Sequence, residues 1–464
     1  MAASQLNGMG SAARVQRLGT ERVGKLLLEM SAQTTFSLMV YAVYSITDTY
    51  FLSVGVGALA AAGASIISPV LLALGGVATI VGVGGASVVS RALGEGDGER
   101  ASRTVANTFL IFWTVAAAIT VLGALWIEPL VRLLGATESI APYAVEYGRI
   151  IFLGALTSTG FSAIIRADGS VRFSTAIWVI PVTANLVLCW LFIMVLGMGA
   201  AGAALATVAG QAISAVMSIY FFFFRRGRSY HIQAGYFRPQ WSIIGAVLLI
   251  GLPSFLKSMG ASLLVIITNN LLRGLGGDSA LAVYAIVSRL FAALGLPQTG
   301  IVQGMQPLVG YNFGQGRFDR VRQVLGLSLR ATVVYGLLAA GLCWLLPGVL
   351  LRALSTDSTV VAEGQGALRL LALSYPLGGV AILAAGYFQS LGLARNALLL
   401  ALGGALLVKI PVLLLGARLF GLNGIWAAEA LSELILCIAA LALLHVSKPR
   451  HSVPTQRELF NAKS

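Results

Sequence analysis

An aspartate lies inside an apolar segment near the start of the chain, within Tyr44-Ser-Ile-Thr-Asp48-Thr-Tyr-Phe51. A charge inside a membrane span is costly and is by default a functional hypothesis. A carboxylate placed there could bind a cation or exchange a proton. The competing interpretation is a helix-end carboxylate that faces interfacial water, because only about four residues separate Asp48 from the predicted end of its span.

Polar residues on two later apolar segments fall at a related depth. Asn185 and Cys189 are four residues apart, on one face of a helix, and Thr207 lies one or two turns into the next segment. At roughly 1.5 Å per residue, these positions share the outer half of the membrane with Asp48. A carboxylate, an amide and a hydroxyl together could bind a hard cation or hold a protonated acid.

The second half of the chain carries its own polar set. An internal repeat, described below, places Asn269 opposite Asp48 and Glu429 opposite Thr207. Lys409 is predicted at nearly the depth of Glu429 on a neighbouring helix. A Lys–Glu pair would lessen the cost of burying either charge. Structural pairing and a direct role in substrate binding or ion coupling both stay open.

Three more charged residues belong to this half. Glu433 lies one turn below Glu429, on the same helix face. Arg289 and Lys257 lie within apolar segments, and we interpret them first as hydrogen-bonding anchors between helices.

Composition indicates the environment of all these residues. The 464 residues are 58% hydrophobic and 10% charged, with a mean hydropathy of +0.88, whereas soluble chains carry roughly a quarter charged residues. Continuous apolar runs argue against a membrane β-barrel, whose strands alternate. We therefore predict an all-α membrane protein of about twelve transmembrane helices, at 27–52, 58–86, 105–127, 143–165, 174–197, 201–224, 243–272, 280–306, 325–348, 366–390, 396–417 and 424–446.

Basic residues gather on one side of the predicted membrane. The formal charge is +14, but most of the 31 Lys and Arg residues fall in the termini and in loops on the same side. The opposite loops hold Arg132, Arg273, Arg352 and Arg418. Cytoplasmic loops carry such an excess, so we expect both termini in the cytoplasm and no nucleic-acid partner. The three cysteines fall inside spans, which argues against a disulfide framework and a Cys-rich metal site.

The chain repeats one unit. Gly94-Glu-Gly96 recurs 220 residues later as Gly314-Gln-Gly316, and Gly169 recurs 223 residues later as Gly392. With six helices per half, the repeat predicts two lobes related by a pseudo-twofold axis along the membrane normal. The predicted parts are an N-terminal cytoplasmic segment 1–26, an N-lobe 27–224, a cytoplasmic linker 225–242, a C-lobe 243–446 and a cytoplasmic tail 447–464.

Several segments together resemble the bacterial branch of the multidrug and toxic compound extrusion (MATE) family, over nearly the whole chain. They are Ile46–Thr49, Ser288–Leu290, Gly304–Gly314, Phe388–Gly392 and Phe420–Trp426. The resemblance implies a V-shaped pair of lobes. It also implies antiport of amphipathic, often cationic compounds against inward H⁺ or Na⁺.

The resemblance also implies site residues. The family's helix 1 Asp, helix 5 Asn and helix 6 Thr match Asp48, Asn185 and Thr207, and a helix 4 Tyr matches Tyr147. The family often has a second Asp four residues after that Asn, where this chain has Cys189. This departure removes a carboxylate, so we expect H⁺ rather than Na⁺ as the coupling ion.

The leading hypothesis is a monomeric, H⁺-coupled exporter of drugs or toxic amphiphiles, embedded in the bilayer of a bacterial inner membrane and without a cofactor. A Na⁺-coupled exporter or a flippase for lipid-linked precursors is the alternative within transport. A membrane-embedded transferase would need a carboxylate cluster for a divalent metal. The sequence shows no such cluster, and we expect no enzyme.

Overall fold

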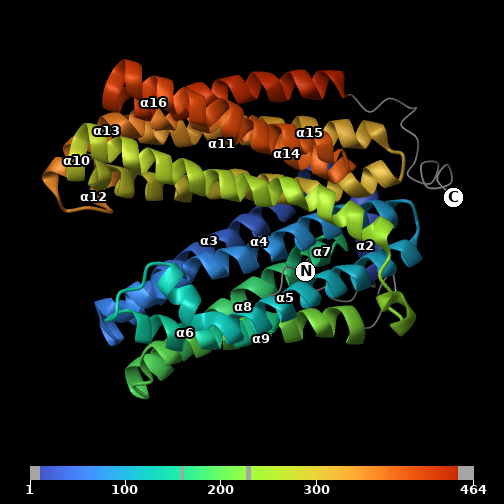
Figure 1. Ribbon diagram of the computed structural model, residues 1–464. Helices are drawn as coiled ribbons and strands as arrows, with labels where there is room; N and C mark the ends of the chain where they lie inside the picture. The colour runs from blue at the N-terminus through green and yellow to red at the C-terminus, as the bar shows by residue number, and fades with distance from the viewer. Residues whose placement is uncertain (1–10, 158–160, 226–230, 448–464) are drawn as a thin grey trace.

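Helices form almost all of the computed structural model, which describes residues 11–157, 161–225 and 231–447 (Figure 1). The first lobe contains α2 (Ser11–Thr20), α3 (Val23–Gly55), α4 (Ala58–Gly94), α5 (Gly98–Leu133), α6 (Ala141–Leu153), the 3₁₀ turn η1 (Gly154–Thr157), α7 (Ser162–Ala167), α8 (Val171–Cys189), the π-helical η2 (Trp190–Val195), α9 (Gly199–Ile219) and the π-helical η3 (Tyr220–Phe224).

The second lobe follows a short connection that includes the 3₁₀ turn η4 (Ala234–Phe237). It contains α10 (Trp241–Gly314), α11 (Phe318–Leu345), α12 (Pro347–Arg352), α13 (Ser358–Ala372), α14 (Ser374–Leu391), α15 (Ala394–Leu398), the π-helical η5 (Leu399–Lys409) and α16 (Ile410–Val446). Parts of the predicted N-terminal segment, linker and tail, at 1–10, 226–230 and 448–464, lie outside the described residues. The bounds that we predict for the five parts stay a prediction.

The number of membrane spans follows from helix length. Within the described residues, nine helical segments are long and apolar enough to cross a membrane, and the bent pair α13–α14 adds a tenth. Three of the nine contain breaks: α5 is kinked at Trp126, and two others are broken at a glycine with positive φ. The 74 residues of α10 would extend about 110 Å at 1.5 Å per residue, but its backbone leaves the helical conformation at Gly277, where φ is 62°.

The second glycine break lies in α16 at Gly421, where φ is 58°, a conformation that favours glycine. The chain doubles back here: a Cβ on Gly416 would lie only 2.6 Å from the carbonyl oxygen of Gly424. Because α10 and α16 each fold back at their break, each counts as two spans, and the ten segments give twelve spans. The prediction of an all-α fold with about twelve transmembrane helices in two six-helix lobes is confirmed.

Several helices run past the spans that hydropathy predicts. The span predicted at 58–86 continues as helix to Gly94, and the one predicted at 105–127 begins at Gly98. A polar cap explains the second start, because the Asp97 carboxylate accepts a hydrogen bond from the Arg100 backbone N–H at 2.8 Å. Hydropathy detects the part of a helix inside hydrocarbon, not the polar turns beyond it.

Buried apolar side chains show how the lobes meet. At the end of the molecule that carries α2, here called the terminal end, one core joins the lobes and includes Met30 and Phe109 of the first with Met305 and Phe388 of the second. Toward the opposite, far end each lobe has its own core. Figure 1 shows the ribbons diverging in the same direction. The lobes are therefore joined at the terminal end and packed separately at the far end.

A reciprocal backbone contact lies on the seam between the lobes. A Cβ on Gly94 would collide with the carbonyl oxygen of Tyr311, and one on Gly314 would collide with the carbonyl oxygen of Arg91. The 220-residue repeat relates Gly94 to Gly314 and Arg91 to Tyr311. Each half therefore makes the same contact with the other, as a twofold relation requires.

We expect Gly84→Ala to destabilise the protein by about 1–3 kcal/mol, as overpacking typically does. A methyl group on Gly84 of α4 would collide with the backbone of Val247 in the other lobe. The measurement is thermal unfolding in detergent. Gly75→Ala on the same helix is the matched control, because nothing lies within 4 Å of its added Cβ. Equal unfolding temperatures for the two variants would contradict close packing at the seam.

Candidate functional site

Three of the residues predicted for the N-lobe site meet between α3 and α8. The Cys189 thiol lies 3.4 Å from Oδ1 of Asp48 and 3.6 Å from Oδ1 of Asn185. A thiol carries a single hydrogen, so it can donate to one of the two oxygens at a time. Cys189 and Asn185 are buried, and Asp48 is half-buried. The carboxylate is therefore the most accessible member of this group.

Close helix packing sets the position of Asn185. On α9, a Cβ at Gly210 would lie 3.2 Å from Cβ of Asn185 and 3.2 Å from the Pro181 carbonyl oxygen. This glycine lets α9 approach α8 at the level of the site. Directly after Cys189 the helix changes to the π form of η2, an irregularity frequent at functional sites.

Thr207 and two tyrosines complete the N-lobe group. The phenols of Tyr44 and Tyr147 lie close enough to Asp48 and Thr207 to interact with both electrostatically. The amide nitrogen of Asn185 is buried and lacks a hydrogen-bond partner within the described part of the chain. Buried polar atoms without protein partners commonly serve a bound water, ion or ligand.

The predicted C-lobe residues form an ion-pair cluster between η5 and α16. The Lys409 ammonium lies 2.6 Å from Oε1 of Glu429 and 2.6 Å from Oε1 of Glu433. Lys257 of α10 is within electrostatic range of Glu433 and Lys409. On α14, a Cβ at Gly378 would lie 2.9 Å from Cδ of Glu433. The glycine leaves the room that this carboxylate occupies.

Charge balance distinguishes the two clusters. Lys257 and Lys409 match Glu429 and Glu433 in number, so the C-lobe cluster is neutral in its ionised form. The N-lobe group contains one carboxylate, that of Asp48, and no basic side chain among its named members. An added proton or cation is therefore favoured more by the N-lobe group.

Two predicted residues do not join the C-lobe cluster. Asn269 and Arg289 are exposed, and within the described residues neither forms a hydrogen bond or ion pair. Tyr284 interacts electrostatically with Glu429 and also with Thr268, the neighbour of Asn269. Sequence analysis missed Tyr284 and Tyr44. The four-residue spacing from Tyr44 to Asp48 was a usable signal, because it places both on one helix face.

Comparison with known families and proteins agrees with this architecture. The MatE family model matches residues 34–191 and 253–415. The chain is 25% identical over 435 residues to the multidrug export protein MepA of Staphylococcus saprophyticus, which covers 93% of this chain and 95% of that protein.

Solved structures share the fold over almost the whole chain. A crystal structure of MATE in complex with MaL6 superposes with a TM-score of 0.87 at 21% identity, covering 97% of this chain and 99% of that one. A multidrug resistance MATE family transporter of the MOP superfamily in an outward-facing conformation has a TM-score of 0.86 at 22% identity, with the same coverage.

Proposed function

This chain belongs to the bacterial branch of the MATE family of multidrug efflux transporters, and from that premise we propose that it exports drugs by antiport against H⁺. The proposed cycle alternates access by rocking the two lobes about their seam. The seam at the terminal end would open as the far end closes. The proposed substrates are amphipathic, often cationic compounds, in keeping with the multidrug export proteins that the chain resembles.

The observation that carries H⁺ coupling is the lone carboxylate of the N-lobe group. A dehydrated Na⁺ needs several oxygen ligands and favours added negative charge. Asp48 supplies one formal negative charge, and the thiol of Cys189 occupies the position of a second acid. A single half-buried carboxylate suffices to exchange a proton.

The proposed membrane and orientation are inferred from the charge distribution of the chain and from its bacterial relatives. We place the protein in the bacterial plasma membrane as a monomer, with lipid around both lobes. The basic termini and the loops on their side would face the cytoplasm, so that the terminal end is cytoplasmic.

We expect the native protein in proteoliposomes to export drug in response to an imposed pH gradient, without a Na⁺ gradient. Cys189→Asp should make transport depend more strongly on Na⁺, because it adds a second carboxylate beside Asp48. Cys189→Ser is the matched control, since it replaces sulfur by oxygen without adding charge. Native efflux that requires a Na⁺ gradient and ignores pH would reverse the assignment in favour of Na⁺ coupling.

A further inference from the structure

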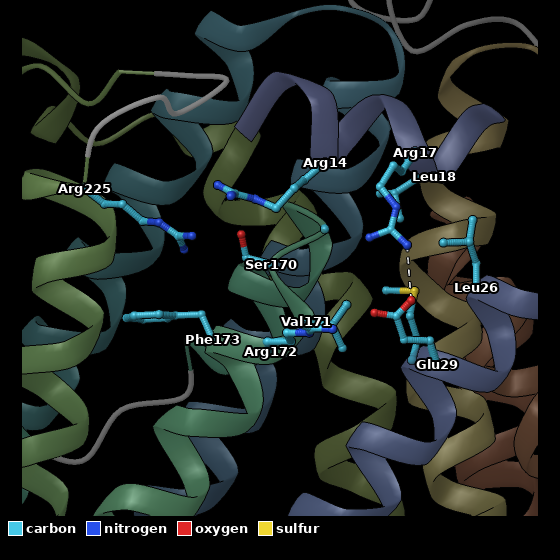
Figure 2. Close-up of a pocket in the computed structure, with 12 residues that line it drawn as sticks. Arg14, Arg17, Leu18, Leu26, Glu29, Ser170, Val171, Arg172, Phe173 and Arg225 are labelled. Carbon is cyan, nitrogen blue, oxygen red and sulfur yellow. Dashed lines mark hydrogen bonds and ion pairs between the residues drawn. The ribbon is translucent and has the colours of Figure 1, made fainter. Parts of the chain in front are cut away.

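A pocket at the terminal end is lined by several basic side chains among apolar ones (Figure 2). It encloses about 60 Å³ between α2, the start of α3, the start of α8 and the end of η3. Four arginines line it: Arg14, Arg17, Arg172 and Arg225. None of its lining residues belongs to the N-lobe group around Asp48 or to the C-lobe cluster, so neither proposed polar site accounts for it.

The carboxylates around the pocket do not match these charges. Arg17 is paired, at 2.6 Å from Glu21 and 3.2 Å from Glu29, and Glu21 is shared with Lys25 at 2.5 Å. The buried Asp168 interacts electrostatically with Arg14. Counting Glu29 and Asp168 against the four lining arginines leaves two positive charges in excess.

Two arginines face each other across the pocket. Figure 2 shows the guanidinium groups of Arg14 and Arg225 pointing toward one another, with Ser170 between them. Burial and then the nearby Arg225 charge lower the pKa of Arg14, against the opposing effect of Asp168. Like charges held this way repel, and an anion between them would relieve the repulsion.

The Arg225 side chain is held in place while part of it stays unpaired. Its guanidinium lies 5.3 Å from the ring centre of Phe173 and 5.1 Å from that of Phe221, a cation–π arrangement with two rings that also contact each other. Its Nη1 is buried and has no hydrogen-bond partner within the described residues. A buried charged donor without a partner is costly, and a small shift of this guanidinium toward an anion in the pocket would satisfy it with a charge-assisted hydrogen bond.

The helices around the pocket favour an anion electrostatically, and they place the pocket at the edge of the apolar span of α3. The 19-residue α8 begins at Val171 beside the pocket, and the side chain of its N-cap residue, Ser170, makes no capping hydrogen bond. The free N–H groups of a helix start attract anions. Leu26 and Met30 line the pocket on the side of α3, where that helix enters its apolar span. The pocket thus has arginines beside apolar side chains, as expected for a site at the level of the phospholipid phosphates.

We propose that this pocket binds a phosphate group, carried by an anionic phospholipid headgroup or present as free phosphate. Paired arginine donors match the geometry of phosphate oxygens. Basic pockets between transmembrane helices bind phospholipid headgroups in this way. A bound phosphate would connect α2 to α8 and to the end of η3 through the arginines that line the pocket. The proposal stands independently of the coupling ion and of the transported compound.

The test uses the full chain, purified in a neutral detergent and titrated with phosphatidylglycerol, phosphatidylcholine or inorganic phosphate while thermal unfolding is followed. Phosphatidylglycerol should raise the unfolding temperature saturably, and phosphatidylcholine should do so less. Arg225→Gln should weaken the phosphatidylglycerol effect by about tenfold, the loss expected for one charge-assisted hydrogen bond. Arg14→Gln provides a second variant in case the first fails to fold.

Arg322→Gln is the charge-matched control, because Arg322 lies on α11 with its side chain 58% exposed, 3.8 Å from Asp319. It should leave the titration unchanged. A saturable rise with inorganic phosphate that is lost in Arg225→Gln would identify free phosphate as the source. If no phosphate-bearing probe stabilises the native chain, or if Arg322→Gln weakens the effect as much as Arg225→Gln, the proposal is overturned.

Discussion

Replacement of Asp48 by asparagine is expected to reduce active drug efflux to the background rate while leaving the protein folded in the membrane. An amide is nearly isosteric with a carboxylate, but it cannot take up and release a proton at neutral pH. Its carbonyl oxygen can still accept the hydrogen bond that the Cys189 thiol offers Oδ1 of Asp48 at 3.4 Å. The substitution thus removes titration and preserves the local packing.

The measurement is efflux from proteoliposomes under an imposed pH gradient, at equal amounts of reconstituted protein. Asp319→Asn is the matched control, because it makes the same chemical change at a side chain that is 99% exposed. It should transport at the native rate. Efflux at the native rate by the Asp48 variant would show that this carboxylate does not couple transport to H⁺. The C-lobe cluster would then be the alternative coupling site.

The second large effect is expected in stability, from Lys409→Met. The variant removes the cation that Glu429 and Glu433 share, each at 2.6 Å, and leaves two carboxylates close together. Removing one partner of a buried ion pair costs roughly 3–5 kcal/mol, and here Lys257 would be left as the one cation of the cluster for two carboxylates. We expect the unfolding midpoint in mild detergent to fall accordingly.

Second substitutions should recover part of this loss, unequally. Glu433 is 9% exposed and Glu429 is 28% exposed, so desolvation acts more strongly on Glu433. In the Lys409→Met background, Glu433→Gln should therefore restore more stability than Glu429→Gln. Additive changes throughout the double-mutant cycles would show that these groups do not interact.

Sequence reasoning works here for features that depend on hydropathy and depth. Long apolar runs predict the spans, and depth along them relates Asp48 to Cys189, which lie on different helices. Lys409 and Glu429 follow from the same reasoning. These relations need only the rise of a helix and the order of spans across the membrane.

Rotation about a helix axis is harder to predict. The repeat offset varies from 220 to 223 residues between landmarks, and an error of one residue turns a side chain by about 100°. For this reason the prediction selects Asn269, which is exposed, whereas the neighbouring Thr268 is buried and interacts with Tyr284.

Backbone irregularities are a second limit. Lys409 is the last residue of the π-helical η5. A π turn changes the angular position of every residue after it. The hydropathy pattern of η5 does not separate it from an ordinary α-helix, so the sequence locates Lys409 in depth but not in direction.

The reciprocal contact of Gly94 with Tyr311 and of Gly314 with Arg91 is the kind that two identical chains make in a symmetric dimer. Such a contact would arise if an ancestral gene encoded one six-helix chain that dimerised through this surface, and if that gene was then duplicated and fused. Fusion lets the two halves acquire different chemistry while the joining surface is kept. The descendant halves now differ in this way, with a lone carboxylate at Asp48 in one and a neutral set around Lys409 in the other.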